Sequence, residues 1–199
     1  MSGTEYGSWA PEAHDAGWVT VFGDASMKAS LPAQLRRVGC AIVQCPWMRC
    51  KTIAKRGEVL TGLRQEVGRG ELWSFLMALR CAAHNLIYVC DRRSVYDGWH
   101  AQAWHSKHMA ESDLWRQVPE AAAVHKRVVL VLWMESHQDA EQEAEVGNEA
   151  RAYFKYGNDR ADEEAKERRR AGEVPPPHKL NRGYESDQLL AWHSDAWQT

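Results

Sequence analysis

Four acidic side chains occupy places in the sequence where carboxylates are uncommon. Two of them end apolar strand-like segments, one lies on the apolar flank of a helical pattern, and one lies beside alanines in a charged helical segment; they are Asp24, Asp91, Glu71 and Asp162, in that order. Acidic residues avoid such positions because desolvating a carboxylate is costly. Taken singly, each has a plain structural role as a turn residue, a helix cap or a solvated acid. Taken together, they predict a cluster that binds a divalent cation, since hard oxygen ligands suit Mg²⁺ or Mn²⁺.

Three strands are expected ahead of Glu71. Residues 18–24 are β-branched and aromatic and apolar on both faces, which is typical of a central strand. Residues 38–43 and the stretch 49–60 have the composition of the next two strands, and Pro46 marks the turn between them. These segments predict an antiparallel meander.

The periodicity of the sequence changes from Gly70 onward. Apolar residues recur at helical spacing and predict a helix that stops near Asn85. Residues 86–90 form a short apolar strand that runs into Asp91, and a short helix is expected near 94–103. The remaining predicted elements are a helix capped by Ser112, a buried strand over 128–133 and a charged helix over 158–170.

The predicted order of elements is β-β-β-α-β-α-α-β-α, which favours an α/β fold with a mixed sheet flanked by helices. We expect one domain over residues 17–172, preceded by an N-terminal tail over 1–16. Prolines 175–177 separate this domain from a polar C-terminal tail over 173–199.

Composition sets limits on the class of protein. The chain has 199 residues, 44% of them hydrophobic, and a net charge of −2. No apolar run reaches the length of a membrane span, and the N-terminus lacks the features of a signal peptide, so we expect an intracellular protein, nuclear or cytoplasmic. The net charge is no signature of a nucleic-acid binder, but basic residues gather between Lys28 and Arg69, which permits a local phosphate-binding face.

The acidic positions, with the residues around them, resemble the type 1 ribonuclease H family. The matching segments are Val-Phe-Gly-Asp24-Ala-Ser, Gly70-Glu71-Leu-Trp, Tyr-Val-Cys-Asp91 and Gly157-Asn-Asp-Arg-Ala-Asp162. Ser112-Asp-Leu-Trp115 and Trp133-Met-Glu-Ser-His137 resemble two further segments of that family. The resemblance covers roughly residues 18–170, is nearest to retroelement-type domains, and implies a ribonuclease H-like sheet of five strands.

The resemblance implies an enzyme that hydrolyses the RNA strand of RNA–DNA hybrids with two Mg²⁺ ions, for which Mn²⁺ is a substitute. It implies that Asp24 bridges both ions and that Asp162 holds the ion that generates the attacking hydroxide. Glu71 and Asp91 would hold the ion beside the leaving oxygen, and His137 would assist proton transfer or product release. Two ions about 4 Å apart suit this task, because one activates water while the other stabilises the leaving oxyanion.

Five further residues are candidates for substrate binding: Ser26, Gln65, Arg69, Trp99 and Trp104. Ser26 and Gln65 are the nearest polar substitutes for the paired asparagines that the family often has before Glu71, where this chain has Val67 and Gly68. RNA is told from DNA by contacts to its 2′-hydroxyl, so strict hybrid specificity is less firmly implied than nuclease chemistry. The two tryptophans either pack the DNA strand or belong to the core, and the sequence favours neither.

Two other functions remain open at the level of sequence. One is a nuclease of the same fold with another nucleic acid as substrate, since fold alone does not fix the substrate. The other is a catalytically silent binding or connection module, against which the four intact acidic residues argue. The host process, the oligomeric state, the role of the acidic stretch 138–149 and the presence of a reverse transcriptase domain in a parent polyprotein are left open.

Overall fold

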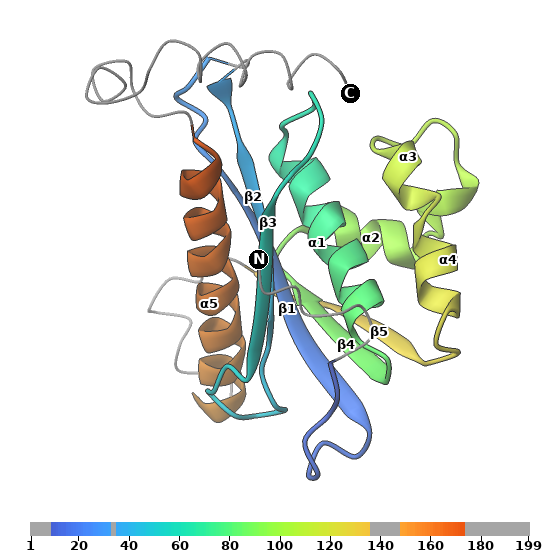
Figure 1. Cartoon of the computed structure of the whole chain (residues 1–199). Helices are drawn as coiled ribbons and strands as arrows, with labels where there is room; N and C mark the ends of the chain where they lie inside the picture. Colours follow the sequence, from blue (N-terminus) through green and yellow to red (C-terminus); the bar gives the residue numbers. More distant parts are fainter. Residues whose placement is uncertain (1–8, 33–34, 136–147, 174–199) are drawn as a thin grey trace, which may run out of the picture.

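The structure, a computed structural model, describes residues 9–32, 35–135 and 148–173. Its centre is a sheet of five strands in the order β3-β2-β1-β4-β5. The strands are β1 (Trp18–Met27), β2 (Val38–Gln44), β3 (Ala54–Val59), β4 (Asn85–Cys90) and β5 (Val129–Trp133). The two strands that carry acids at their carboxyl ends, β1 and β4, lie side by side in the middle of this sheet (Figure 1).

The sheet is mixed, as the sequence predicts. The strands β1, β2 and β3 form an antiparallel meander, with Asp24 opposite Ala41 in the first pair. The strands β1, β4 and β5 run parallel to one another. Parallel neighbours need crossover connections, and the helices between β3, β4 and β5 provide them. The fold class predicted from the sequence is therefore confirmed.

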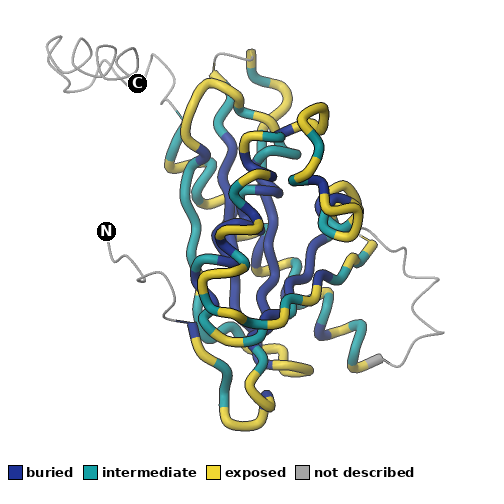
Figure 2. Tube along the Cα trace, turned by 90° about the vertical axis from the view of Figure 1, so that its right-hand side faces the viewer, coloured by how far each residue is buried: buried dark blue, intermediate teal, exposed yellow. Residues whose placement is uncertain are grey.

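Helices cover both faces of the sheet. The helical elements are α1 (Val67–Cys81), α2 (Arg93–His100), the 3-10 helix η2 (Ala103–His105), α3 (Ser112–Trp115), α4 (Val118–Ala123) and α5 (Asn148–Gly172). Of the described helices, α5 is the one that packs on one face, across β1, β2 and β3, while α1 packs on the other face with the shorter helices beyond it (Figure 1). The buried residues gather along the strands and the inner sides of these helices (Figure 2).

The last helix is longer than the sequence predicts. It begins at Asn148 rather than at residue 158, so Asp162 lies in its middle and not in its first turns. The part that the prediction missed contains Gly157, and glycine is unfavourable inside a helix. A Cβ atom at this position would lie 2.4 Å from the Phe22 ring, so the glycine is required where the helix crosses β1 closely.

Two other predicted elements differ locally. The third strand begins at Ala54 rather than at residue 49. The helix expected from Ser112 is divided into α3 and α4, with Pro119 in the first turn of α4. Proline suits a helix start because it lacks the N–H that a preceding turn would need.

Part of the predicted N-terminal tail is packed on the domain. Trp9 is buried against the core under α1, and its backbone N–H donates to the carbonyl of Cys81 at 3.0 Å. The domain boundaries themselves remain a prediction. No helix in the described ranges is both long and apolar enough to cross a membrane.

Candidate active site

Asp24 and Asp91 are brought together by the register of two parallel strands. Phe22 of β1 is paired with Val89 of β4, and each aspartate follows its pair member by two residues. Side chains two residues apart in a strand share a face. Phe22 and Val89 belong to the apolar cluster under α5, so Asp24 and Asp91 emerge at the end of that cluster.

Glu71 reaches the same place from α1, on the other face of the sheet. The helix approaches β1 so closely at Gly70 that a Cβ atom there would lie 2.7 Å from the Ala25 Cβ. The Ser74 hydroxyl donates to the Asp24 carbonyl at 2.9 Å, which fixes the helix against the strand. The Ala25 N–H then lies 2.7 Å from Asp24 Oδ1 and 3.3 Å from Glu71 Oε1. One carboxylate oxygen each from Asp24, Glu71 and Asp91 lies within 4.8 Å of the others.

Two carboxyl groups of this cluster, those of Asp24 and Glu71, have raised pKa values. Burial, followed by the negative charge of Asp91, raises the pKa of Asp24 to about 7. Burial, followed by the charges of Asp24 and Asp91, raises the pKa of Glu71 well above its ordinary range. Glu71 Oε2 is buried and has no hydrogen-bond partner among the described residues. The negative charge of the cluster is therefore not fully compensated by the protein groups around it.

The cluster opens into a cavity of about 770 Å³. The cavity lies between the carboxyl ends of the central strands and α5, and Asp162 of α5 lines it together with the three clustered carboxylates. Asp162 lies outside the group whose oxygens are within 4.8 Å of one another. Its Oδ2 accepts a hydrogen bond from Lys166 Nζ at 2.5 Å, one turn further along the helix.

Other residues that line the cavity were not identified from the sequence. A stripe along α5 contributes three basic residues and one acidic residue: Arg151, Lys155, Lys166 and Asp159. Arg92 lines the opposite side, next to Asp91. The 3.6-residue spacing of the stripe is visible in the sequence, but it could be used only after recognising that the helix begins at Asn148.

Gln65 and Arg69 lie at the start of α1, and Ser26 lies on β1. Ser26 is half-buried near the end of β1, opposite Gly39 of β2. The Gln65 amide is engaged by the backbone, because its oxygen accepts from the Val38 N–H and its nitrogen donates to the Leu60 and Gly62 carbonyls.

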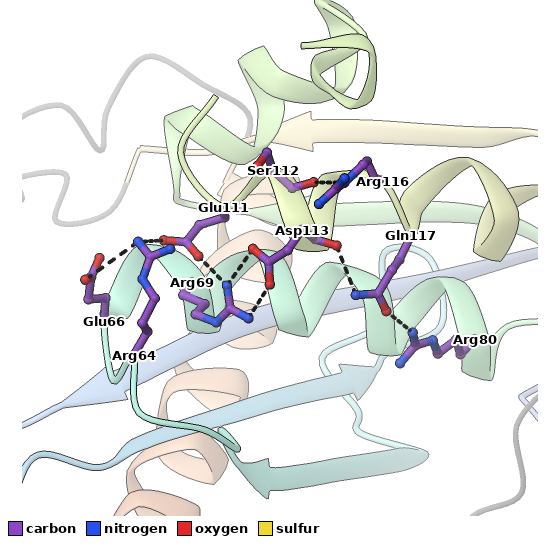
Figure 3. Close-up of polar contacts among 9 residues, drawn as sticks. All are labelled: Arg64, Glu66, Arg69, Arg80, Glu111, Ser112, Asp113, Arg116 and Gln117. Atoms are coloured by element: carbon purple, nitrogen blue, oxygen red, sulfur yellow. Dashed lines mark hydrogen bonds and ion pairs between the residues drawn. The ribbon is translucent and has the colours of Figure 1, made fainter. Parts of the chain in front are cut away.

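Arg69 belongs to a polar network between α1 and α3 (Figure 3). Its guanidinium donates to Asp113 through both terminal nitrogens and to Glu111 at 2.5 Å. Arg64 also binds Glu111, at 3.0 Å. These contacts explain the position of Arg69 without a substrate, and its predicted role in substrate binding stays a prediction.

The two tryptophans pack on the core and on each other. The Trp99 ring meets Phe75 edge-on, with centroids 5.5 Å apart, and lies 5.5 Å from the Trp104 ring. Both side chains are only partly buried, so each retains an accessible part. His137, residues 138–147 of the acidic stretch and residues 174–199 of the C-terminal tail lie outside the described residues.

The chain is similar to known proteins in three-dimensional structure. No family model and no curated protein matches the sequence. The chain is similar to the N-terminal RNase H domain of a Mycobacterium tuberculosis protein, with 16% identity, a TM-score of 0.53, and coverage of 78% of this chain and 96% of that one. It is also similar to RNase H1 of Halobacterium salinarum, with 15% identity, a TM-score of 0.54, and coverage of 76% of this chain and 97% of that one.

A third similar structure belongs to a larger protein. It is a foamy viral protease-reverse transcriptase in complex with an RNA/DNA hybrid, at 13% identity and a TM-score of 0.56. The match covers 79% of this chain and 20% of that one. At such identities the comparisons establish a ribonuclease H fold.

Proposed function

We propose that this protein is a metal-dependent endonuclease that hydrolyses the RNA strand of RNA–DNA hybrids. The observation that carries the proposal is the convergence of Asp24, Glu71 and Asp91 within 4.8 Å, at the carboxyl ends of the central strands of a ribonuclease H fold. Carboxylates from two strands and a helix, far apart in sequence, would repel one another in water and have no structural reason to meet there.

The residues fit divalent metal ions. The donor set consists of carboxylate oxygens, which are the ligands that Mg²⁺ and Mn²⁺ prefer. The buried Glu71 Oε2 atom lacks a partner among the described residues, and a cation is the simplest group that would satisfy it. The pKa values of Asp24 and Glu71 are raised first by burial and then by the charges of neighbouring carboxylates, and bound cations would offset both effects.

The proposed role of each side chain follows from its position in the site. Asp24, Glu71 and Asp91 would hold the metal, and the Ala25 N–H fixes the orientation of the first two. Asp162 lies across the cavity on α5 and would complete the ligand set after separating from Lys166. Bound divalent ions would supply an activated water on one side of the phosphodiester and stabilise the leaving oxygen on the other. His137 would assist proton transfer or product release without binding metal.

The choice of an RNA–DNA hybrid as substrate is supported by the named neighbours, one of which is an RNase H-containing protein solved with a hybrid. The same neighbour supports a reverse transcriptase domain as the partner in a parent polyprotein. A second candidate, a nuclease for another nucleic acid, is favoured by one observation. Both N–H groups of the Gln65 amide donate to backbone carbonyls and its oxygen accepts from the Val38 N–H, which leaves no free donor and one acceptor lone pair for a 2′-hydroxyl in this conformation.

A gel assay separates these functions. The purified protein is incubated with end-labelled RNA–DNA hybrid, duplex RNA, duplex DNA and single strands, each with Mg²⁺ or with a chelator. The proposal predicts cleavage of the RNA strand of the hybrid, only with the metal. Cleavage of DNA or of duplex RNA at a comparable rate would favour the second candidate. Binding without cleavage in Mg²⁺ and Mn²⁺ would indicate a silent binding module.

A further inference from the structure

Among the residues that the structure describes, four cationic side chains line the acidic cavity, and three of them already have partners. Lys166 binds Asp162 at 2.5 Å and Lys155 binds Asp159 at 3.6 Å. Arg151 also interacts with another group. The side chain of Arg92 forms no ion pair or hydrogen bond within residues 9–32, 35–135 and 148–173, although it lines a cavity rich in carboxylates.

Arg92 is held close to the cluster by the chain itself. It directly follows Asp91 and is the N-cap residue of α2. Its Nη2 atom lies 3.6 Å from the place that a Cβ atom of Gly68 would occupy, so the guanidinium lies over the first turn of α1. That turn contains no acidic residue to neutralise it. The Arg92 charge is thus exposed on the α1 side of the cavity, opposite the paired lysines of α5.

We propose that Arg92 binds a backbone phosphate of the strand that is cut, next to the cleaved linkage, and so positions that strand over the carboxylate cluster. The inference rests on the proposed function and adds a specific anchoring residue to it. A polyanion that enters the cavity meets the repulsion of Asp24, Glu71 and Asp91, and bound metal offsets this only at the cleaved phosphate itself. The neighbouring phosphate needs a cation of its own.

The chemistry and surroundings of Arg92 suit this task. A guanidinium presents a planar fork of donors that matches two phosphate oxygens at once. Because Arg92 has no protein partner to give up, binding costs no broken ion pair, unlike the use of Lys166. Gly68 leaves the space beside the guanidinium open to a ligand.

The first test compares Arg92→Ala and Arg92→Lys with Arg116→Ala, a control that removes another exposed arginine, at the end of α3 and outside the residues that line the cavity. We expect Arg92→Ala to raise KM for the hybrid roughly 10-fold with little change in kcat, because the lost contact is present before and during the reaction. In an Asp24→Asn background that binds without cutting, the slope of log affinity against log salt should fall by about one for Arg92→Ala. Arg92→Lys should keep the slope, and Arg116→Ala should leave both quantities unchanged.

A second variant uses the open space at Gly68. Gly68→Glu places a carboxylate beside the guanidinium and should weaken hybrid binding, whereas Gly68→Ala fits at 3.6 Å and should not. Gly68→Glu should reduce the affinity for the hybrid less in an Arg92→Ala background, because the new carboxylate then has no Arg92 guanidinium to pair with. A hybrid in which one phosphate of the cut strand, adjacent to the cleaved linkage, is a neutral methylphosphonate should bind the wild type and Arg92→Ala equally.

The outcomes separate this inference from the proposed function. If the wild type cuts the hybrid but Arg92→Ala retains its KM and its salt slope, Arg92 does not bind phosphate and the inference is wrong. The inference is also wrong if Arg92→Ala still weakens binding to hybrids in which each flanking phosphate in turn is a methylphosphonate. It is wrong as well if Arg92→Ala lowers the melting temperature and changes nothing else. If the wild type cuts no hybrid in any metal, the proposed function itself fails.

Discussion

At the scale of single residues, the buried carboxylates of the cluster repel one another in the metal-free protein, which lowers the stability of the fold. Asp24 changes from an ordinary pKa of 3.8 to about 7 on folding because it is buried beside Asp91. A carboxyl group whose pKa is raised by folding favours the folded state while it is protonated. That contribution is complete below about pH 4 and is lost as the pH rises through 7.

This behaviour predicts a pH-dependent difference between the wild type and Asp24→Asn in chelator-treated protein. The variant cannot ionise at this position, so its melting temperature should exceed that of the wild type by an amount that grows from pH 5 to pH 8. Mg²⁺ should raise the melting temperature of the wild type more than that of the variant. Melting curves followed by circular dichroism measure both effects. A constant difference across this pH range would show that Asp24 does not carry the repulsion.

His137 is the predicted site residue that depends most on the family resemblance. If it assists proton transfer without binding metal, His137→Ala should slow turnover by roughly 10²-fold, at the low end of general acid–base contributions. The Mg²⁺ concentration for half-maximal rate should stay nearly unchanged. Turnover at the wild-type rate would make His137 a surface residue, and a large increase in the Mg²⁺ requirement would make it a ligand.

At the scale of elements, the site depends on how closely α1 approaches β1. A Cβ atom at Gly70 would lie 2.5 Å from Val38 Cγ1 and 2.7 Å from Ala25 Cβ. Gly70→Ala should therefore push the helix away, loosen the Ser74 bond to Asp24 and displace Glu71. We expect it to destabilise the fold by about 1–3 kcal/mol, as overpacking does, and to reduce cleavage more than 10-fold.

Gly68→Ala is the matched control, because it adds the same methyl group to the same helix with no contact closer than 3.6 Å. It should be neutral or slightly stabilising, since alanine favours helix more than glycine does. Urea unfolding and initial cleavage rates measure the pair. Equal stability and equal activity of the two variants would contradict the role of the close approach at Gly70.

The sequence predicts elements well where their ends are marked by a change in residue type. The apolar runs into Asp24 and Asp91 mark the ends of β1 and β4, and the parallel register then brings the two acids together. Prediction from the sequence fails where a close tertiary contact outweighs the local conformational preference of a residue. Gly157 looks like a loop residue, yet it lies inside α5 because Phe22 leaves room for nothing larger.

At the scale of the whole molecule, charge pairing changes the expected electrostatics. The basic run from Lys28 to Arg69 has few acids near it in sequence, but the fold brings acids to it from far away. The pairs are Lys55 with Glu164, Arg64 with Glu111, and Arg69 with Glu111 and Asp113. No local pattern could reveal this, because the partners lie more than 40 positions away. The positive face is weaker than the sequence alone suggests.

Hybrid binding should still weaken as salt is added, despite the net charge of −2. Each phosphate neutralised by a cation releases counterions, and the slope of log affinity against log salt counts them. Because several basic residues are internally paired, we expect a slope that corresponds to only a few phosphates. Fluorescence anisotropy of a labelled hybrid measures this slope. The salt concentration would be varied from about 50 to about 300 mM, where electrostatic screening changes strongly. Affinity that is independent of salt would contradict a phosphate-binding face.

The most direct measurement of the central claim is the rate of RNA-strand cleavage in a labelled hybrid by Asp24→Asn and Asp91→Asn in Mg²⁺. Asp97→Asn is the control, since Asp97 pairs with Arg93 on α2 and takes no part in the cluster. The account predicts that the control retains the wild-type rate, while both cluster variants lose at least 10³-fold and stay folded by circular dichroism. Cleavage near the wild-type rate by either cluster variant would contradict the assignment of the active site.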